Sequence, residues 1–420
     1  MLSQPLLRLA SAVSCRRTKP LLCIALLAYV ASVWDNLVNM RPIQENGELR
    51  IESRLDKIIE PLREKIRDLE KSFTQKYSPV KFLSEKDCKR ILVTGGMGFV
   101  GSYLMDKLMM DGHKVTVVDN FFMGRKRNME HWVSHENFEL INHDMLEQLS
   151  IEVDQIYHLA SPASPPSYMY NPFKTLKTNT VGTLNMLGLA KQVGARLFLA
   201  STSEVCRDPE VHPQTEDYWG RVNPIGPCPR CRQVASRVAE MCYACMKQEG
   251  VAVRVARIFN TFGPRMHMND GWVVSNFILQ ALQGEPLTVY RSGSQTRAFR
   301  YVSDLVNRLV ALTNSNVSSP VKLGNPEEHT ILEFAQLIKN PVGSGSKIQF
   351  LSEAQDDPQR RKPDIKKAKL MPGWEPMVLR EEGLNKAIFY FRKELEYHAN
   401  NQYIPKPKPA RMKTERASHN

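Results

Sequence analysis

A glycine-rich turn near residue 95 constrains the fold of this 420-residue chain more than any other feature. An apolar run at 91–94 leads into Gly95-Gly-Met-Gly98-Phe-Val-Gly101, and a helical pattern follows. A second apolar run, 115–118, then ends at Asp119. Glycines with this spacing let backbone approach a pyrophosphate, and the next helix offers free N–H groups to it. An acid closing the second strand accepts hydrogen bonds from a ribose diol, so this order of elements predicts a dinucleotide-binding unit.

Three details qualify that prediction. The alternative to a ligand site is a tight glycine turn that binds nothing. Arg125-Lys126-Arg127 would suit a 2′-phosphate, but Asp119 favours NAD as the dinucleotide. Met97 stands inside the glycine turn, where we expect its bulk to press on the pyrophosphate.

The charge excess lies mainly at the two ends of the chain. The formal net charge is +13, with a basic cluster at 16–19 and recurring Lys and Arg between 406 and 416. A nucleic-acid-binding protein usually carries a basic patch with its own motif, and the sequence has none. We therefore expect solvated basic ends, an anionic small-molecule ligand and no nucleic-acid partner. The length allows one or two domains with a large core.

The first forty residues predict a membrane anchor. Residues 1–19, which end in basic side chains, precede an apolar segment at 20–40. We expect 1–19 to be a cytosolic tail and 20–40 a single-pass type II signal anchor, with the body of the chain in a lumen. A short span suits membranes of the early secretory pathway, and a cleaved signal peptide is the alternative. In a lumen, Asn316-Val-Ser318 becomes a glycosylation acceptor.

Residues 41–85 predict a helical stem. Apolar residues recur there at spacings of four and three, which is a heptad pattern typical of a self-associating coiled coil. These residues are Leu55, Ile59, Leu62, Ile66, Leu69 and Phe73, and Pro61 interrupts them. An isolated amphipathic linker helix is the alternative. Residues 401–420 are basic and Pro-spaced, which predicts a disordered tail.

Strand-like and helix-like runs alternate from 88 to 400, which predicts an α/β fold. We expect strands at 91–94, 115–118, 155–159, 197–200 and 253–257, and a helix at 172–193. Buried apolar strands separated by helices form a parallel, doubly wound sheet of the Rossmann type. We expect 88–265 mainly to bind the cofactor and 266–400 mainly to form a smaller substrate-binding lobe.

Two Cys-x-x-Cys pairs are the remaining candidate site. Cys228-Pro-Arg-Cys231 and Cys242-Tyr-Ala-Cys245 resemble paired zinc knuckles, and a lumen also tolerates disulfides. The second pair lies in a helix-like run at 238–248, which argues against a metal site. We therefore expect no bound metal.

Several longer motifs carry a resemblance to a known family. They are Tyr157-His-Leu-Ala-Ser161, Thr202-Ser-Glu-Val205, Pro264-Arg-Met-His-Met-Asn-Asp270 and Gln295-Thr-Arg-Ala-Phe299. Together they resemble the extended short-chain dehydrogenase/reductase family and, within it, the UDP-glucuronate decarboxylases (UDP-xylose synthases). The resemblance covers essentially the whole chain, and the anchored N-terminus is similar to that of the Golgi enzymes.

The resemblance implies a reaction and a setting. Bound NAD⁺ oxidises the sugar C4 hydroxyl of UDP-glucuronate, the resulting 4-keto acid loses CO₂, and the reduced cofactor returns its hydride to give UDP-xylose. The xylose feeds glycan and proteoglycan synthesis. The resemblance further implies a Golgi membrane location, a lumenal catalytic domain and a homodimer or higher homo-oligomer.

Residue roles are also implied by the resemblance. Thr202 would hydrogen-bond the C4 oxygen, Glu204 would assist proton transfer or position the carboxylate, and Arg297 would hold anionic groups. The implied cofactor-binding set is Gly95, Gly98, Phe99, Val100, Gly101, Asp119, Asn120, Phe122, Gly124, Asp144, Met145, Leu159, Ser161, Thr178, Ala200, Thr261 and His267. The implied substrate-binding set is Leu149, Lys177, Asn185, Gly188, Lys191, Gln248, Glu249 and Arg297, although Lys191 also reads as a solvated helix residue.

The sequence departs from this family at its catalytic dyad. The family places Tyr-x-x-x-Lys on one helix, where Lys and the nicotinamide charge lower the pKa of the tyrosine so that it acts as base. Aligning Arg237-Val-Ala-Glu240 with the family puts Arg232 at the tyrosine and Ser236 at the lysine. The other register gives Cys231 and Ala235. An arginine is always protonated near neutral pH and cannot be that base.

Other departures stand at positions that the resemblance places near ligands. They are Cys206, Arg207, Trp272, Arg291, Cys245 and Ser150. Three hypotheses follow: a working decarboxylase, a catalytically impaired paralogue that binds NAD or UDP-sugar or pairs with an active subunit, and a metal or redox role for the cysteine pairs. We expect the family function by descent, with severely reduced or absent turnover.

Overall fold

The computed structural model describes residues 80–206, 209–218, 220, 230–352, 358–370 and 377–400, except for the side chains of 230–235 and 245. The chain divides into two units, Met1–Gln75 and Lys76–Asn420, and every described residue belongs to the second. The predicted tail at 1–19, anchor at 20–40, most of the stem at 41–85, the Cys228 pair and the tail at 401–420 lie outside the described residues. Among the described helices, none combines the length and apolar character needed to cross a bilayer.

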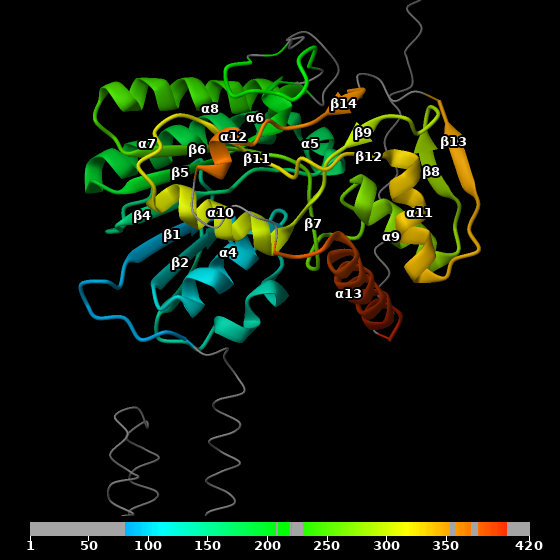
Figure 1. Ribbon diagram of the computed structural model, residues 1–420. Helices are drawn as coiled ribbons and strands as arrows, with labels where there is room; N and C mark the ends of the chain where they lie inside the picture. The colour runs from blue at the N-terminus through cyan, green and yellow to red at the C-terminus, as the bar shows by residue number, and fades with distance from the viewer. Residues whose placement is uncertain are drawn as a thin grey trace, which may run out of the picture. The chain divides into compact units, whose positions relative to one another are not determined.

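A seven-stranded parallel sheet forms the centre of the second unit (Figure 1). Its order is β11-β6-β5-β4-β1-β2-β3, and every pairing within it is parallel. The strands are β1 (Arg90–Thr94), β2 (Lys114–Asp119), β3 (Phe138–Asn142), β4 (Gln155–His158), β5 (Arg196–Thr202), β6 (Val253–Ile258) and β11 (Val321–Leu323). The predicted Rossmann-type parallel sheet is confirmed.

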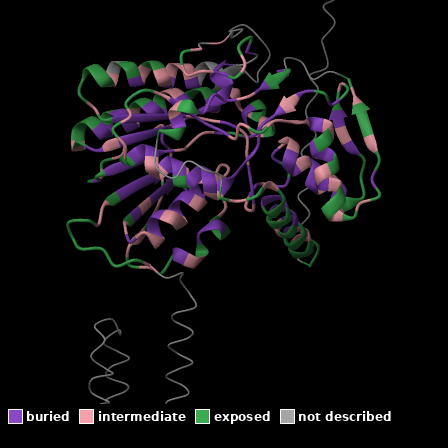
Figure 2. Cartoon of the chain, in the orientation of Figure 1, coloured by how far each residue is buried: buried purple, intermediate pink, exposed green. Residues whose placement is uncertain are grey.

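Helices cover both faces of this sheet because successive strand residues face opposite sides. In β1, Ile91 and Val93 enter one hydrophobic core while Leu92 enters another. Helices α4 (Phe99–Met110) and α10 (Val302–Asn314) pack on the first face, and α7 (Thr183–Val193) and α8 (Arg230–Gln248) pack on the second. Figure 2 shows the resulting buried layer along the strands.

The strand order reverses next to β1, which places a crevice at the carboxyl ends of β1 and β4. The chain runs from β1 to β2 and β3 on one side, and then returns to β4 on the other side of β1. Ligands of open α/β sheets bind at such a switch point. The glycine turn follows β1 directly and Leu159 follows β4, so both lie at this edge.

The helix predicted at 172–193 consists of three pieces. Helix α6 (Pro172–Lys177) passes through a π-helical turn, η3 (Thr178–Gly182), into α7. Short helices flank this edge: α5 (Pro165–Tyr170), and the 3₁₀ turns η1 (Lys126–Asn128), η2 (Glu130–Trp132) and η4 (Ser203–Cys206). A π-helical turn re-aims the side chains that follow it and is frequent at functional sites.

The remaining elements form smaller sheets and their covering helices. The small sheets pair β7 (Thr261–Phe262) with β10 (Arg300–Tyr301), β8 (Leu287–Tyr290) with β13 (Ile348–Leu351), and β9 (Thr296–Arg297) with β12 (His329–Thr330) and β14 (Arg360–Arg361). The helices are α9 (Val273–Gln283), α11 (Ile331–Val342), α12 (Lys366–Lys369) and α13 (Arg380–Asn400). Within 266–400, β11 is a strand of the main sheet and α10 packs on that sheet. The substrate lobe is therefore not one continuous segment.

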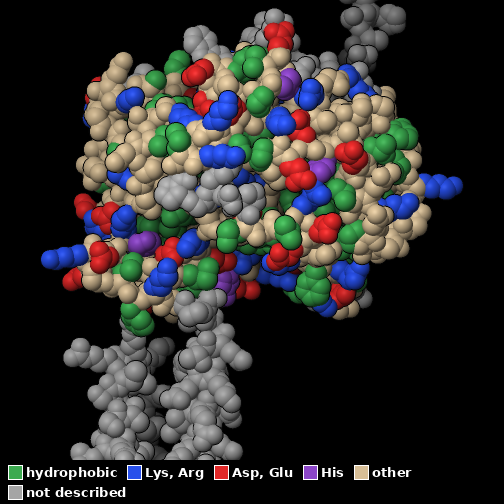
Figure 3. All heavy atoms as spheres, viewed as in Figure 1, with side chains coloured by type: hydrophobic (Ala, Val, Ile, Leu, Met, Phe, Trp, Pro, Cys, Tyr) green, Lys and Arg blue, Asp and Glu red, His purple; other side chains and the backbone are tan. Residues whose placement is uncertain are grey.

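Charged side chains of both signs are interspersed on the face shown in Figure 3. The basic clusters at 16–19 and 406–416 lie outside the described residues.

Candidate functional site

The glycine turn has the close backbone packing that the sequence predicts. Gly95 has φ +69°, and a Cβ on it would lie 2.9 Å from the backbone N and Cα of Ala160. A Cβ on Gly101 would lie 2.7 Å from the Cα of Gly96, so α4 could not approach the turn with any larger residue there. Gly98 precedes α4 and supplies no side-chain cap, which leaves the helix start open to an anion.

Met97 does not press on the ligand edge of this turn. Its side chain is fully buried in the core that also contains Ile91 and Leu104. The expectation that Met97 crowds a pyrophosphate is therefore wrong, because the turn directs this side chain inward. Its backbone N–H instead donates to Asp119 Oδ2 at 3.2 Å.

Asp119 closes β2 beside the glycine turn and is buried. Its Oδ1 accepts the N–H of Phe121 at 2.9 Å, and burial raises the pKa of this carboxyl above its usual value. Both oxygens retain acceptor capacity after these bonds. The carboxylate is thus held in place as the ribose-binding prediction requires.

Polar side chains lie beside Asp119, at the carboxyl ends of β2 and β3. Asn120 Nδ2 donates to Asp144 Oδ2 at 2.9 Å, and Lys174 Nζ donates to the same oxygen at 3.3 Å. Lys174 Nζ also lies 4.7 Å from the ring centre of Phe122. The side-chain hydrogen bond from Asn120 and the charge of Lys174 lower the pKa of Asp144 against a burial effect that raises it. These groups join the ends of β2 and β3 to α6.

Two buried hydroxyls lie near the other half of the crevice. Ser161 Oγ and Thr178 Oγ1 are buried and have no hydrogen-bond partner among the atoms that the structure describes. Both belong to the predicted cofactor-binding set. Buried polar atoms without partners are rare in native folds, and a ligand that offers hydrogen bonds would satisfy them. Together with the glycine turn, they fit a dinucleotide.

His158 supports the floor of this crevice from below. Its Nδ1 lies 2.8 Å from Thr94 Oγ1, and its Nε2 lies 3.2 Å from Thr183 Oγ1. Burial lowers the pKa of His158 to about 4, so the ring is neutral at physiological pH. Thr94 Oγ1 also accepts the N–H of Ala160 at 3.3 Å, which joins the ends of β1 and β4.

A polar cluster lies at the carboxyl end of β5. The N–H of Glu204 donates to Thr202 Oγ1 at 3.2 Å, and both side chains are buried. Arg361 Nη1 lies 3.8 Å from Glu204 Oε1, and Arg361 is the register partner of Arg297 in the β14–β9 pair. The cluster thus brings a hydroxyl, a carboxylate and two buried guanidinium groups to one edge. The sequence predictions missed Arg361.

Helix α8 is tied to this cluster by two sets of contacts. Arg237 donates through Nε and Nη2 to the carbonyl of Val205, at 3.0 and 2.6 Å. Glu240 accepts from Ser201 Oγ at 2.5 Å and from Nε and Nη2 of Arg257, at 3.1 and 2.9 Å. These contacts fix the rotation and axial position of α8 against β5 and β6.

The loop that precedes α9 carries His267 and Asp270. His267 Nδ1 accepts the N–H of Asn269 at 3.1 Å, and burial with the nearby positive charge of Arg125 lowers its pKa to about 4. Burial raises the pKa of Asp270 to about 6 although Ser275 donates to it. Thr261 Oγ1 bonds the carbonyl of Phe259 at 3.0 Å.

The chain matches two family models. The NAD dependent epimerase/dehydratase family covers residues 91–323, and a UDP-glucuronate decarboxylase N-terminal model covers residues 4–78. UDP-glucuronic acid decarboxylase 1 of Xenopus tropicalis is 76% identical over 98% of this chain and 98% of its own length. The chain belongs to the UDP-glucuronic acid decarboxylase family.

Solved structures share the fold of this family member. UDP-glucose 4-epimerase from Thermotoga maritima, determined with UDP-glucose, is 28% identical with a TM-score of 0.65 over 73% of this chain and 99% of its own. UDP-glucose 4-epimerase from Thermus thermophilus, determined with NAD, is 25% identical with a TM-score of 0.61 over 72% of this chain and 99% of its own.

The two positions predicted for the dyad, 232 and 236, both fall on α8, one turn apart. Ser236 is buried, whereas the side chain of Arg232 is not among those described. Arg237 and Glu240, which set the alignment with the family, make the contacts that position this helix. Which register aligns with the family, Arg232 with Ser236 or Cys231 with Ala235, stays a prediction.

The predicted substrate residues divide into two groups. Asn185 Nδ2 donates to the carbonyls of Met145 and Leu146, at 2.9 and 3.1 Å, so it holds the loop that leads to Leu149. Lys177 is exposed at the end of α6, next to Thr178.

Lys191 and Glu249 instead form an exposed ion pair of 2.7 Å, near exposed Gly188 and Gln248. They lie at the C-terminal ends of α7 and α8, which lead into the amino ends of β5 and β6. Thr202 lies at the opposite, carboxyl end of β5, so the structure does not bring these four residues together with it.

The departures outside the dyad have varied settings. Cys206 is fully buried and its thiol donates to the carbonyl of Tyr218 at 3.4 Å, whereas Ser150 is exposed. Trp272 precedes α9 and packs against the core. Arg291 has φ +55°, a left-handed conformation that favours glycine. Arg207 and the side chain of Cys245 lie outside the described residues.

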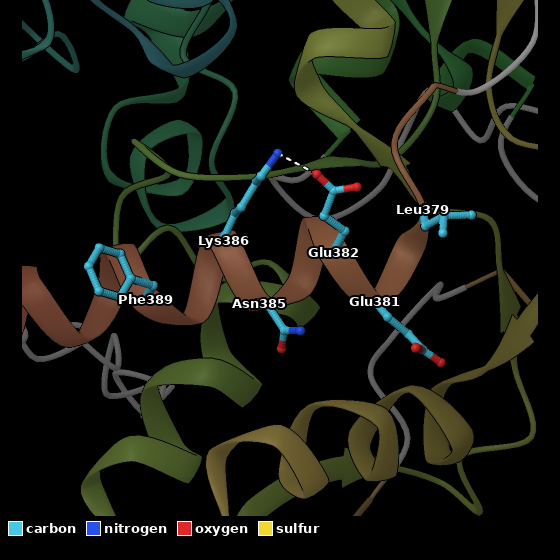
Figure 4. Close-up of a pocket in the computed structure, with 6 residues that line it drawn as sticks. All are labelled: Leu379, Glu381, Glu382, Asn385, Lys386 and Phe389. Carbon is cyan, nitrogen blue, oxygen red and sulfur yellow. Dashed lines mark hydrogen bonds and ion pairs between the residues drawn. The ribbon is translucent and has the colours of Figure 1, made fainter.

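Cys88, Cys206 and Cys242 form no disulfide, and the described residues contain no group of three metal-binding side chains. Figure 4 shows a shallow pocket on α13, where Glu382 and Lys386 form an ion pair of 2.6 Å. No predicted site residue lines this pocket, whose members are Leu379, Glu381, Glu382, Asn385, Lys386 and Phe389. The candidate site is therefore the crevice at the strand ends.

Proposed function

We propose that the function of this chain, by membership of its family, is NAD-dependent decarboxylation of UDP-glucuronate to UDP-xylose and CO₂. The observation that carries the proposal is the convergence of two groups at one sheet edge. The glycine turn with Asp119 suits a dinucleotide, and the cluster of Thr202, Glu204 and Arg361 suits an acidic sugar. The alternative is an impaired paralogue that binds these ligands or pairs with an active subunit.

The NAD site would be formed by the crevice at β1 and β4. The open start of α4 would bind the pyrophosphate, Asp119 the adenine ribose, and Ser161 and Thr178 further polar groups of the cofactor. When bound, NAD⁺ would supply a hydride acceptor for the sugar C4 position and a hydride donor after CO₂ leaves.

The polar cluster would handle the sugar. Thr202 Oγ would hydrogen-bond the C4 oxygen and orient it. Arg361 and Arg297 would bind anionic groups of the substrate through their planar forks, which match carboxylate geometry. Glu204, whose charge is balanced by Arg361 at 3.8 Å, would position the carboxylate or move a proton at C5.

We further propose that turnover in this chain is severely reduced. Arg232 stands where the family has the tyrosine that acts as general base. Ser236 stands where the family has the lysine that lowers the pKa of that tyrosine. Arginine has no neutral form near pH 7, and serine carries no charge. Loss of a general base typically lowers a rate by ~10²–10⁴-fold.

The test is UDP-xylose formation by the purified full-length chain, incubated with UDP-glucuronate and NAD⁺ and assayed by mass spectrometry. The double variant Arg232→Tyr, Ser236→Lys is assayed beside it, with Arg232→Tyr alone as the control. We expect little product from the native chain and a gain of about 10²-fold or more in the double variant. The single variant should gain less, because its tyrosine lacks the lysine.

Rapid UDP-xylose formation by the native chain would overturn the proposal of reduced turnover and leave the family function standing. If native and double variant are both inactive but bind NAD⁺ and UDP-glucuronate, the impaired-paralogue alternative is favoured. If neither ligand binds to the folded chain, the family function is wrong for this copy.

We propose that the chain forms a homodimer through the outer face of α6, η3, α7 and α8. Exposed apolar side chains follow this face at helical spacing: Phe173, Leu176, Val181, Leu184 and Met241. Adjoining large apolar side chains on a soluble surface mark an interaction site, and a second copy offers a matching face under twofold symmetry. Light scattering should give a dimer for the native chain and a monomer for Phe173→Glu, Leu184→Glu. A dimeric variant would exclude this face.

We propose a Golgi membrane location with the catalytic unit in the lumen, anchored by 20–40. The basic residues before that segment support this orientation, and Asn316 is exposed in the loop after α10, where a glycan could attach. In cells, glycosidase digestion should shift the native chain but not Asn316→Gln, and both should co-localise with a Golgi marker. A native chain with no glycan, recovered in the cytosol, would contradict the proposal.

A further inference from the structure

The segment that follows Asp119 brings two arginines to the rim of the predicted ribose site. Gly124 lies directly against the acid, because a Cβ on it would be 2.9 Å from both carboxylate oxygens and 2.6 Å from the Cβ of Met97. The N–H of Arg125 donates to the carbonyl of Met97 at 3.2 Å, which pins the backbone there. Arg125 and Arg127 therefore start within a few residues of the carboxylate that would bind the ribose.

Both arginines are paired with one buried carboxylate from the far end of the chain. Arg125 Nη1 lies 3.3 Å from Glu394 Oε2, and Arg127 Nη1 lies 2.6 Å from Glu394 Oε1. Glu394 is on α13 and is only 2% exposed. The guanidinium of Arg127 also stacks 4.5 Å above the ring of Tyr397, one turn further along the same helix.

Other charged groups near this carboxylate do not compete for it closely. His398 Nε2 lies 3.9 Å from Glu394 Oε2. Lys126, between the two arginines, points its Nζ over the ring of Phe121 at 5.3 Å. Glu394 on α13 thus supplies the charge that balances the two arginines.

The distinction between NAD and NADP is a charge distinction at this position. A 2′-phosphate carries about two negative charges and is usually bound by a free arginine fork, whereas an acid at the end of the second strand binds the ribose hydroxyl. Here Nη1 of each guanidinium is paired with Glu394, which balances part of their charge, and Asp119 would repel the phosphate. The run Arg125-Lys126-Arg127 by itself suits a 2′-phosphate. Glu394, which is 269 positions after Arg125, pairs with the arginines and so weakens their attraction for that phosphate.

We propose that Glu394 is a specificity-determining residue that, by pairing with Arg125 and Arg127, makes the site select NAD⁺ against 2′-phosphorylated dinucleotides. The inference rests on the proposed NAD site at the glycine turn. It adds a role for α13, because the pair couples the last described helix to cofactor choice.

The test is calorimetric titration of the full-length chain with NAD⁺ and, separately, NADP⁺. Glu394→Gln keeps the shape of the buried side chain and releases both arginines. We expect it to bind NADP⁺ about tenfold or more tightly than the native chain does, while its NAD⁺ affinity stays within about threefold. Glu382→Gln is the matched control, because it removes an exposed ion pair from the same helix and should change neither affinity.

Glu394→Asp is a second variant, which keeps the negative charge but shortens the side chain by one methylene. It should raise the NADP⁺ affinity by less than Glu394→Gln does. Adding Arg125→Gln and Arg127→Gln to Glu394→Gln should abolish the gain. Unchanged NADP⁺ affinity in folded Glu394→Gln, or in Glu394→Asp if the first does not fold, would overturn the inference while NAD⁺ binding persists. A folded native chain that binds neither dinucleotide would instead overturn the proposed NAD site, and this inference with it.

Discussion

At the scale of single residues, the crevice depends on a buried histidine that must stay neutral. His158 contacts the hydroxyls of Thr94 on β1 and Thr183 on α7, and neither partner carries a charge that would favour a protonated ring. Its folded pKa of about 4 is below the ordinary value of 6.5. Acid therefore protonates the unfolded chain first, and stability is lost as the pH falls from 6.5 towards 4.

We predict that His158→Gln reduces the loss of unfolding free energy as the pH falls from 6.5 to 4. A shift of this size corresponds to roughly 3 kcal/mol of unfolding free energy between pH 6.5 and 4. Asp270 acts in the opposite sense, because its raised pKa lets the folded chain bind a proton first as the pH falls below about 6. Since both chains retain Asp270, urea unfolding of native and variant chains at several pH values isolates His158. Parallel curves would contradict the assignment.

Site residues that belong to one local motif could be predicted from the sequence. Site residues that the fold brings together from distant segments could not. Gly95, Gly101 and Asp119 lie within one strand–turn–helix–strand unit, so their spacing carries their geometry. Arg361 reaches Glu204 through the pairing of β14 with β9, and Glu394 reaches Arg125 from the last described helix. No local pattern marks either residue. Met97 was misread because spacing does not give the direction of a side chain within a turn.

At the scale of elements, the strands with continuous apolar runs were predictable and the edge strands were not. Those beginning near residues 91, 115, 155, 197 and 253 are confirmed to within about two residues, since both of their faces are buried. β3 is only half-buried at the sheet edge and β11 has three residues, so neither carries that pattern. The π-helical turn η3 has no sequence signal in an otherwise helical run, although it carries Thr178.

At the scale of the whole molecule, the predicted cofactor crevice and the proposed dyad positions are built from different elements. The crevice is built by β1, β2, β4 and α4, whose contacts are intact, whereas the substitutions at 232 and 236 lie on α8. Because Arg237 and Glu240 hold α8 in place, the proposed loss of the dyad would leave the backbone around the crevice unchanged. We therefore expect a chain that binds NAD⁺ with a nearly normal site but turns substrate over poorly.

The most direct test of this account is calorimetric titration of the full-length chain with NAD⁺, beside Gly101→Ala. We predict saturable binding to the native chain and at least about tenfold weaker binding to the variant, because the added methyl would lie 2.7 Å from the Cα of Gly96 and force the turn away from α4. A folded native chain without NAD⁺ binding, or a folded variant that binds it equally well, would contradict the account.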